Sequence, residues 1–212
     1  SILTMLGIII GVAAVIILVT LGGGTTQQVT NQIASLGSNL LIVSPGKRMR
    51  PMASGAAPFK VADAEAIARE ISSLSAVAPV SARAATVIFA NENWSTTVTG
   101  STEEYFIAGN WKAKEGRLLA QGEVHLGAAV CVIGETVRTK LFGNQSPIGS
   151  RIRLNNIACE VVGLLAPKGQ SAMGIDQDDI VVVPLRTYQR RISGNEDINM
   201  IQVSVKDGVS TT

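Results

Sequence analysis

A segment of 21 uncharged residues, positions 1–21, constrains the fold of this chain more than any other feature. It consists mainly of Ile, Leu, Val, Ala and Gly. At about 1.5 Å per helical residue it would reach roughly 31 Å, which matches a bilayer hydrocarbon core of about 30 Å. Only a helix that satisfies its own backbone hydrogen bonds crosses that core. We therefore predict a transmembrane helix over residues 1–21.

Three other interpretations of this segment fit less well. A secretory signal peptide has a basic start, a shorter apolar region and a small-residue cleavage site. A buried core helix usually stops well short of 18 uncharged residues, and an amphipathic surface helix needs a polar face. The chain begins with Ser1 and enters the apolar segment at once, so we expect further residues to precede it.

The distribution of positive charge predicts which side of the membrane the rest of the chain occupies. Lys and Arg are enriched within about 15–20 residues of the cytoplasmic end of a span. The first positive charge after the span is Lys47. We therefore expect the bulk of the chain to be extracytoplasmic.

Two features near the membrane are candidates for helix packing. Gly7 and Gly11 form a G-x-x-x-G motif, in which small residues let a second helix approach closely, although such motifs also arise by chance in membrane helices. Beyond Gly22–Gly24, the apolar face of Val29, Ile33 and Leu36 predicts an amphipathic stalk helix within residues 22–37. These side chains are our candidate helix-packing and stalk-face residues.

Further along, the chain alternates irregularly between strand and helix patterns. This mixture lacks the strict rhythm of a βαβ protein and predicts an α+β fold. The predicted strands cover residues 40–43, 84–90, 94–99, 128–133, 151–154, 157–165, 180–183 and 201–205, with Asn155 and Asn156 as the turn between the fifth and sixth of them. The first predicted helix opens at Asp63 and has the apolar face Ile67, Ile71 and Leu74. A second helix begins at Glu135 and is closed by Gly143, and a basic helix follows Pro184 and runs through Tyr188 to Ile192.

Composition and motifs argue against several function classes. The formal net charge is only +2 and the basic residues are dispersed, so we expect no nucleic-acid partner. Neither a phosphate-binding P-loop nor a G-x-S-x-G nucleophile motif occurs, and His125 is the single histidine. We therefore predict no enzyme activity, cofactor or metal in this chain, with His125 a surface or hydrogen-bonded residue.

One acidic cluster and one cysteine pair remain open to more than one interpretation. Asp176, Asp178 and Asp179 could hold Ca²⁺ through hard oxygen ligands, but the EF-hand pattern is missing and we favour turn formation. Cys131 and Cys159 could pair in an oxidising compartment. We favour buried free thiols, because the sequence cannot supply the geometry of a disulfide.

Several motifs together resemble the MacB-type permeases of ABC transporters. They are TMLGIIIGVAAVI at 4–16, SLGSN at 35–39, VIGETV..KLFG at 132–143, PIG at 147–149, EVVG at 160–163, KGQS..G.DQDD at 168–179 and VPL at 183–185. The resemblance spans nearly the whole chain. It implies a first transmembrane helix at 1–21, a stalk helix at 22–37 and a periplasmic core at 38–212.

The resemblance also implies how the core is divided and what it works with. The core would combine a porter-like α/β sandwich, about 38–98 and 197–212, with an inserted β-rich subdomain, about 99–196. The implied location is the cell inner membrane, among membrane lipid. The implied partners are an ABC ATPase subunit or domain, a second identical or paralogous permease, and a periplasmic adaptor with an outer-membrane channel.

Two classes of function follow. The first is a permease that couples ATP-driven motion of its transmembrane helix to periplasmic export or extrusion of substrate. The second is a membrane-anchored extracytoplasmic sensor or adaptor that only binds partners. Three or so further apolar spans beyond Thr212 would favour the permease, and a soluble tail would favour the adaptor.

Overall fold

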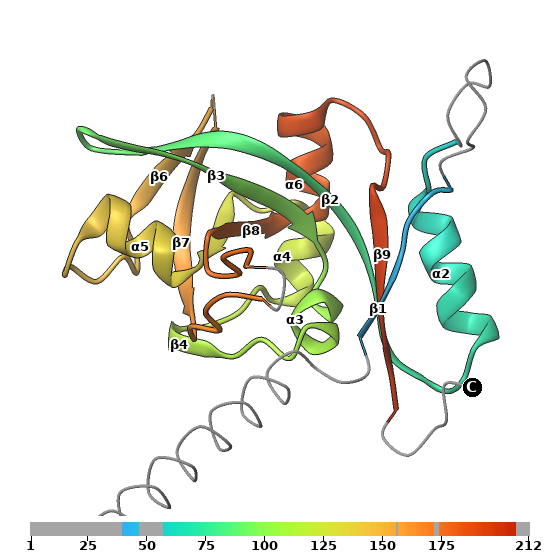
Figure 1. Cartoon of the computed structure of the whole chain (residues 1–212). Coiled ribbons are helices and arrows are strands. Elements are labelled where there is room, and N and C mark those ends of the chain that lie inside the picture. Colours follow the sequence, from blue (N-terminus) through green and yellow to red (C-terminus); the bar gives the residue numbers. More distant parts are fainter. Residues whose placement is uncertain (1–39, 47–56, 156, 172–173, 207–212) are drawn as a thin grey trace, which may run out of the picture. The chain divides into compact units, whose positions relative to one another are not determined.

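The computed structural model describes residues 40–46, 57–155, 157–171 and 174–206 (Figure 1). Within these ranges no helix is long and apolar enough to cross a membrane. The predicted transmembrane and stalk helices lie outside the described residues, as do their candidate packing residues Gly7, Gly11, Val29, Ile33 and Leu36.

The described residues form a mixed fold, which confirms the predicted combination of strands and helices. Its strands are β1 (Leu40–Val43), β2 (Leu74–Phe89), β3 (Glu92–Ser101), β4 (Ala113–Gly116), β5 (Val130–Ile133), β6 (Arg151–Leu154), β7 (Ile157–Leu165), β8 (Ile180–Pro184) and β9 (Met200–Val205). Its helices are α2 (Val61–Glu70), α3 (Glu104–Ala108), α4 (Gln121–Leu126), α5 (Glu135–Phe142), α6 (Leu185–Tyr188) and the π-helix η1 (Gln189–Ser193).

One end of the sheet is built from β1, β9 and the first half of β2, all antiparallel. Figure 1 shows α2 beside β9, and Ala64 of α2 shares an apolar cluster with Ile201 and Val203 of β9. The alternation along β9 is as predicted, because Ile201, Val203 and Val205 are buried and the residues between them are half-buried. Helix α2 thus packs on the sheet through the apolar side chains of β9.

The second half of β2 takes part in a closed ring of strands. The hydrogen-bonded neighbours run β2–β3–β8–β5–β7–β6, and β6 pairs again with β2 through Val87↔Leu154. Closure leaves these strands without a free edge in the ring. Side chains from all six strands and from α5 fill one buried cluster, which includes Val87, Val98 and Ile133.

A second apolar cluster covers the other face of the central strands. Tyr105 and Phe106 of α3 and Val124 of α4 pack with Val132 of β5 and Val182 of β8. Strands β5 and β8 are therefore covered on both faces. This double burial explains why they read as continuous apolar runs rather than as alternating patterns.

Turn residues behave largely as the sequence predicts. Asn155 joins β6 to β7 with φ of 50°, the left-handed conformation that Asn tolerates. Helix α5 ends at Gly143, also with positive φ. The turn between β2 and β3 is shorter than expected, because Phe89 already pairs with Glu92 and leaves only Ala90 and Asn91 unpaired.

One helix prediction needs correction, and three short elements were missed. Helix α2 ends at Glu70, and Leu74 opens β2 by pairing with Val205, so the expected helical face through Ile71 and Leu74 is wrong. The basic helix follows Pro184 as predicted, starting at Leu185, and its second half is the π-helix η1. The short elements α3, α4 and β4 were not expected, because four to six residues are too few to show a period.

Candidate functional site

The acidic cluster is used by the fold itself. Both Asp178 carboxylate oxygens accept backbone N–H groups, from Lys168 at 2.8 Å and Gly169 at 2.9 Å. Asp176 accepts the Asp178 N–H at 2.9 Å and the Thr136 hydroxyl at 2.6 Å. This arrangement confirms the expected turn-forming role of the aspartates.

Asp179 connects the same turn to the ring of strands. Its Oδ1 accepts the indole N–H of Trp94, on β3, at 2.9 Å. Within the part of the chain that the structure describes, no three His, Cys, Asp or Glu side chains converge as metal ligands would. Five of the six carboxylate oxygens of these aspartates accept N–H or O–H donors from the protein itself.

Lys168 lies beside this turn in an unusual environment for a lysine. Its ammonium is 3.9 Å from the centroid of the Trp111 ring and donates to the carbonyl of Gly109. Burial lowers the pKa of Lys168 to about 8, although the Asp178 carboxylate opposes the shift. The cation over the indole face holds the segment after α3 against the acidic turn.

Trp111 also lines an apolar pocket of about 390 Å³. Phe106 and Ile107 of α3 form one side of it, and Leu118 and Leu119 form another. Ile107 is 60% exposed, so the pocket opens beside an apolar surface residue. Glu103, Asn110 and Lys112 also line it, so the pocket combines a mainly apolar surface with a few polar groups, as small-ligand sites do.

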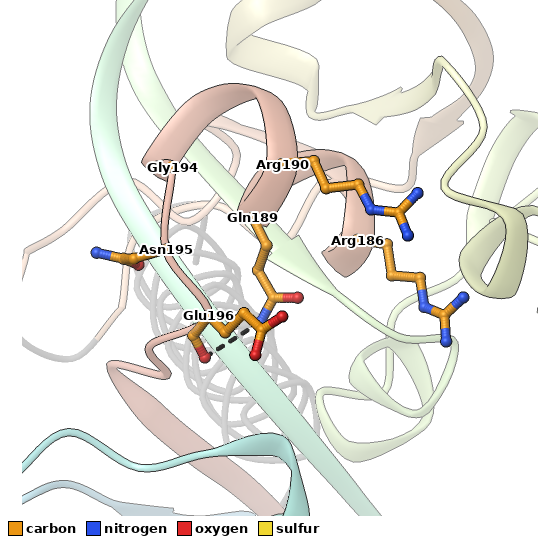
Figure 2. A pocket seen from close by; sticks show the side chains of 6 residues that line it. All are labelled: Arg186, Gln189, Arg190, Gly194, Asn195 and Glu196. Atoms are coloured by element: carbon orange, nitrogen blue, oxygen red, sulfur yellow. Dashed lines mark hydrogen bonds between the residues drawn. The ribbon is translucent and has the colours of Figure 1, made fainter.

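A second pocket, of about 360 Å³, is polar and lies where α6 passes into η1 (Figure 2). Arg186 and Arg190 are four residues apart on this helix, and Gly194, Asn195 and Glu196 form the opposite side. Arg186 donates to the carbonyl of His125 at 2.6 Å. No salt bridge between described residues involves either arginine. The exposed guanidinium groups therefore remain available to an acidic partner.

The remaining candidates have simple structural roles or lie elsewhere. His125 is exposed near the end of α4, as expected for a surface histidine. Cys131 and Cys159 are buried, as predicted, and their sulfur atoms lie 2.9 Å apart. Sequence reasoning missed Trp111, Arg186 and Arg190, because a single aromatic residue or a pair of arginines carries no spacing signal before the fold is known. Lys168 was noted only as part of the motif at 168–179 that resembles the family, and no role was predicted for it.

The chain's relatives were identified by sequence. The family model described as MacB-like periplasmic core domain matches residues 1–212. A macrolide export ATP-binding/permease protein MacB from Azoarcus sp. is 36% identical over 207 residues. The match covers 98% of this chain and 31% of the Azoarcus protein. The MacB protein from Chlorobium luteolum is 37% identical over 210 residues, and the match covers 97% of this chain and 32% of that protein. The chain thus spans about a third of the length of these relatives.

Solved structures show the same fold. The periplasmic region of MacB from Actinobacillus actinomycetemcomitans superposes with a TM-score of 0.70 at 24% identity, covering 84% of this chain and 80% of that one. The extracellular domain of the noncanonic ABC-type transporter YknZ from Gram-positive bacteria superposes with a TM-score of 0.67 at 18% identity, covering 80% of this chain and 85% of that one. Both likenesses concern the fold alone. The family match over the whole sequence leads to one conclusion: this chain belongs to the MacB-like periplasmic core domain family.

Proposed function

We propose that the chain is the first span, stalk and periplasmic core of an ABC transporter permease. It would couple ATP-driven motion of its transmembrane helix to export or extrusion of substrate on the periplasmic side. The observation that carries this proposal is the family match over residues 1–212, which includes the apolar segment as well as the core. ATP would be hydrolysed by a domain or subunit outside this sequence, in keeping with the relatives' description as ATP-binding/permease proteins.

The division of labour within the core follows from this proposal. The porter-like part, about 38–98 and 197–212, would receive motion from the stalk, and the inserted part, about 99–196, would meet partners. The apolar pocket beside Trp111 and the arginine pocket on α6 and η1 both lie within the inserted part. A second permease, an adaptor and an outer-membrane channel are the proposed partners.

A rigid lever is the mechanism that we propose for coupling. Motion of the span would pass through Gly22–Gly24 into the stalk, and it would do so only while the backbone hydrogen bonds are continuous. Each glycine costs about 1 kcal/mol in a helix interior, so this junction needs support from neighbouring chains. Gly7 and Gly11 would provide close packing for such a neighbour.

Val29→Pro in the complete transporter tests the lever. Proline would remove one backbone hydrogen bond, clash with the Thr25 carbonyl and cost about 3 kcal/mol, so it would bend the stalk without touching the core. We expect normal expression and ATP hydrolysis with export of a macrolide lost. Val29→Ala is the matched control, because it keeps the helix and trims one apolar contact. Wild-type export by the proline variant would refute the lever and favour a passive docking module.

A further inference from the structure

The two cysteines meet inside the ring of strands. Cys131 lies on β5 and Cys159 on β7, which are parallel neighbours. Their exposed fractions are 0% and 2%. The Cys159 thiol donates toward the Cys131 Sγ, and the two sulfur atoms are 2.9 Å apart. Two chain segments 28 residues apart therefore bring their thiols into direct contact in the core.

This separation is close to that of a covalent bond. A disulfide has a sulfur–sulfur length of about 2.04 Å, so the sulfur atoms need to approach by about 0.9 Å. The ladder between β5 and β7 is irregular directly after Cys131, where Val162 has no partner on β5. Such a bulge bends the strand locally and lets the backbone adjust next to the cysteine.

The neighbourhood favours no other use of these sulfur atoms. The Cys131 thiol also contacts the carbonyl of Glu160 at 3.5 Å. The remaining members of the surrounding cluster are apolar, including Ile133, Ile152 and Leu164. The single histidine of the chain is exposed on α4, so it cannot complete a metal site with the two thiols.

We infer that Cys131 and Cys159 are joined by a disulfide in the mature protein. The inference rests on the periplasmic placement of the core domain and not on transport. Disulfides form and persist in the bacterial periplasm, whereas the cytoplasm keeps thiols reduced. The bond would tie β5 to β7 and close a loop that contains α5 and β6, which adds a covalent link to the ring of hydrogen-bonded strands.

The oxidant is a disulfide-bearing partner, of the class of the thiol–disulfide oxidoreductases. The thiolate of one cysteine attacks the partner's disulfide, and one partner thiol leaves. The thiolate of the second cysteine then attacks the mixed disulfide, and the second partner thiol leaves. The core gains one sulfur–sulfur bond and gives up two protons and two electrons, which reduce the partner's disulfide to two thiols.

Burial sets when this reaction takes place. Burial raises the pKa of Cys131, so in the folded core its sulfur stays protonated and is a poor nucleophile. An oxidant would therefore act while β5 and β7 are still separate, during folding outside the cytoplasm. Once formed, the bond would resist external reductants for the same reason, because they cannot reach it.

The number of alkylatable thiols tests the proposal directly. The complete transporter is produced in cells, quenched with acid, denatured and treated with a maleimide before and after reduction. We expect neither Cys131 nor Cys159 to be alkylated before reduction and both after it, by mass spectrometry of the peptides. Cys131→Ala and Cys159→Ala are matched controls, because each leaves the other cysteine of the pair without its partner, and that cysteine must react without reduction.

A second measurement distinguishes failure of the disulfide inference from failure of the periplasmic placement on which it rests. Leu126 is 80% exposed, so Leu126→Cys reports with an impermeant reagent whether the core lies outside the cytoplasm. Alkylation of both native cysteines without reduction overturns the disulfide. If the residue 126 thiol is then labelled from outside, the placement survives. If it is protected, the placement falls as well.

Discussion

At the scale of single residues, buried hydrogen-bond acceptors contribute more to the stability of this core domain than salt bridges do. Asp178 is 6% exposed and both of its oxygens receive backbone N–H groups. The salt bridges between described residues involve side chains that keep contact with water. Exposed pairs of this kind are worth about 0–1 kcal/mol each, whereas an orphaned buried donor costs about 1–3 kcal/mol.

Asp178→Ala should therefore destabilise the core strongly. It leaves the N–H groups of Lys168 and Gly169 without their acceptor, and we expect the free energy of unfolding to fall by about 2–4 kcal/mol. Asp178→Asn is the graded control, because its amide oxygen still accepts one hydrogen bond, and about half the loss is expected. Urea denaturation followed by Trp fluorescence measures both. Equal stability of the alanine variant and the wild type would contradict this role.

Glu123 provides a test of pH dependence. Its carboxylate meets both terminal nitrogens of Arg117 at 2.6 and 2.7 Å and accepts the Ala120 N–H, and the bond to Arg117 is the main cause that lowers its pKa. A lowered folded-state pKa means that this contribution is complete above the ordinary value of 4.5 and is lost as pH falls through the folded pKa. Glu123 is half-buried but its partner Arg117 is exposed, so about 1 kcal/mol or less of stability is at stake.

Glu123→Gln should accordingly lower Tm at pH 7, and the difference from wild type should shrink as the pH falls below about 4.5. Thermal unfolding monitored by circular dichroism over a pH series measures this gap. Glu70→Gln, at an exposed position on α2 that forms no ion pair among the described residues, should leave Tm unchanged throughout. A gap that persists undiminished in acid would rule out the ion pair as its source.

At the scale of elements, helix α6 approaches strand β3 closely. A Cβ at Gly100 would lie 2.2 Å from the Cβ of Tyr188, nearer than real side-chain atoms come. Tyr188 is 2% exposed and belongs to the apolar cluster inside the ring. The absence of a side chain at Gly100 thus lets the helix that carries Arg186 and Arg190 rest on the sheet.

Gly100→Ala should move α6 away from β3 and lower the free energy of unfolding by about 2–3 kcal/mol, as overpacking does. Gly122→Ala is the matched control on α4, where an added Cβ meets nothing within 4 Å. Alanine suits a helix better than glycine, so this control should be neutral or more stable by up to about 1 kcal/mol. Denaturation curves that rank the two variants the other way would overturn the close-packing argument.

At the scale of the whole molecule, the placement of the core outside the cytoplasm is the prediction on which the proposed function depends. In intact spheroplasts that carry the complete transporter, Leu126→Cys should react with an impermeant thiol reagent, because Leu126 is 80% exposed. Ser101→Cys is the control, since Ser101 is fully buried and bonded to the carbonyl of Pro79, and it should react only after unfolding. Labelling of the residue 126 thiol only after lysis would reverse the topology.

Much of the core could be predicted from local pattern. The hairpin β6–β7 was expected because Asn155 tolerates positive φ between two apolar runs, and β9 because apolar and polar residues alternate along it. Helix α5 was expected up to Gly143. The division of the core into porter-like and inserted parts, and the roles of Gly7, Gly11, Val29, Ile33 and Leu36, stay predictions.

The sequence by itself determined the family, the apolar N-terminal segment and most strands, because side-chain period and turn residues act over a few neighbouring positions. Only the tertiary structure decided that β2 pairs with β9 in one half and with β3 and β6 in the other, and that β6 closes the ring. It alone placed Cys131 against Cys159 and Lys168 over Trp111. These contacts join residues 28 and 57 positions apart, and chain closure over such distances depends on the packing of every element between them.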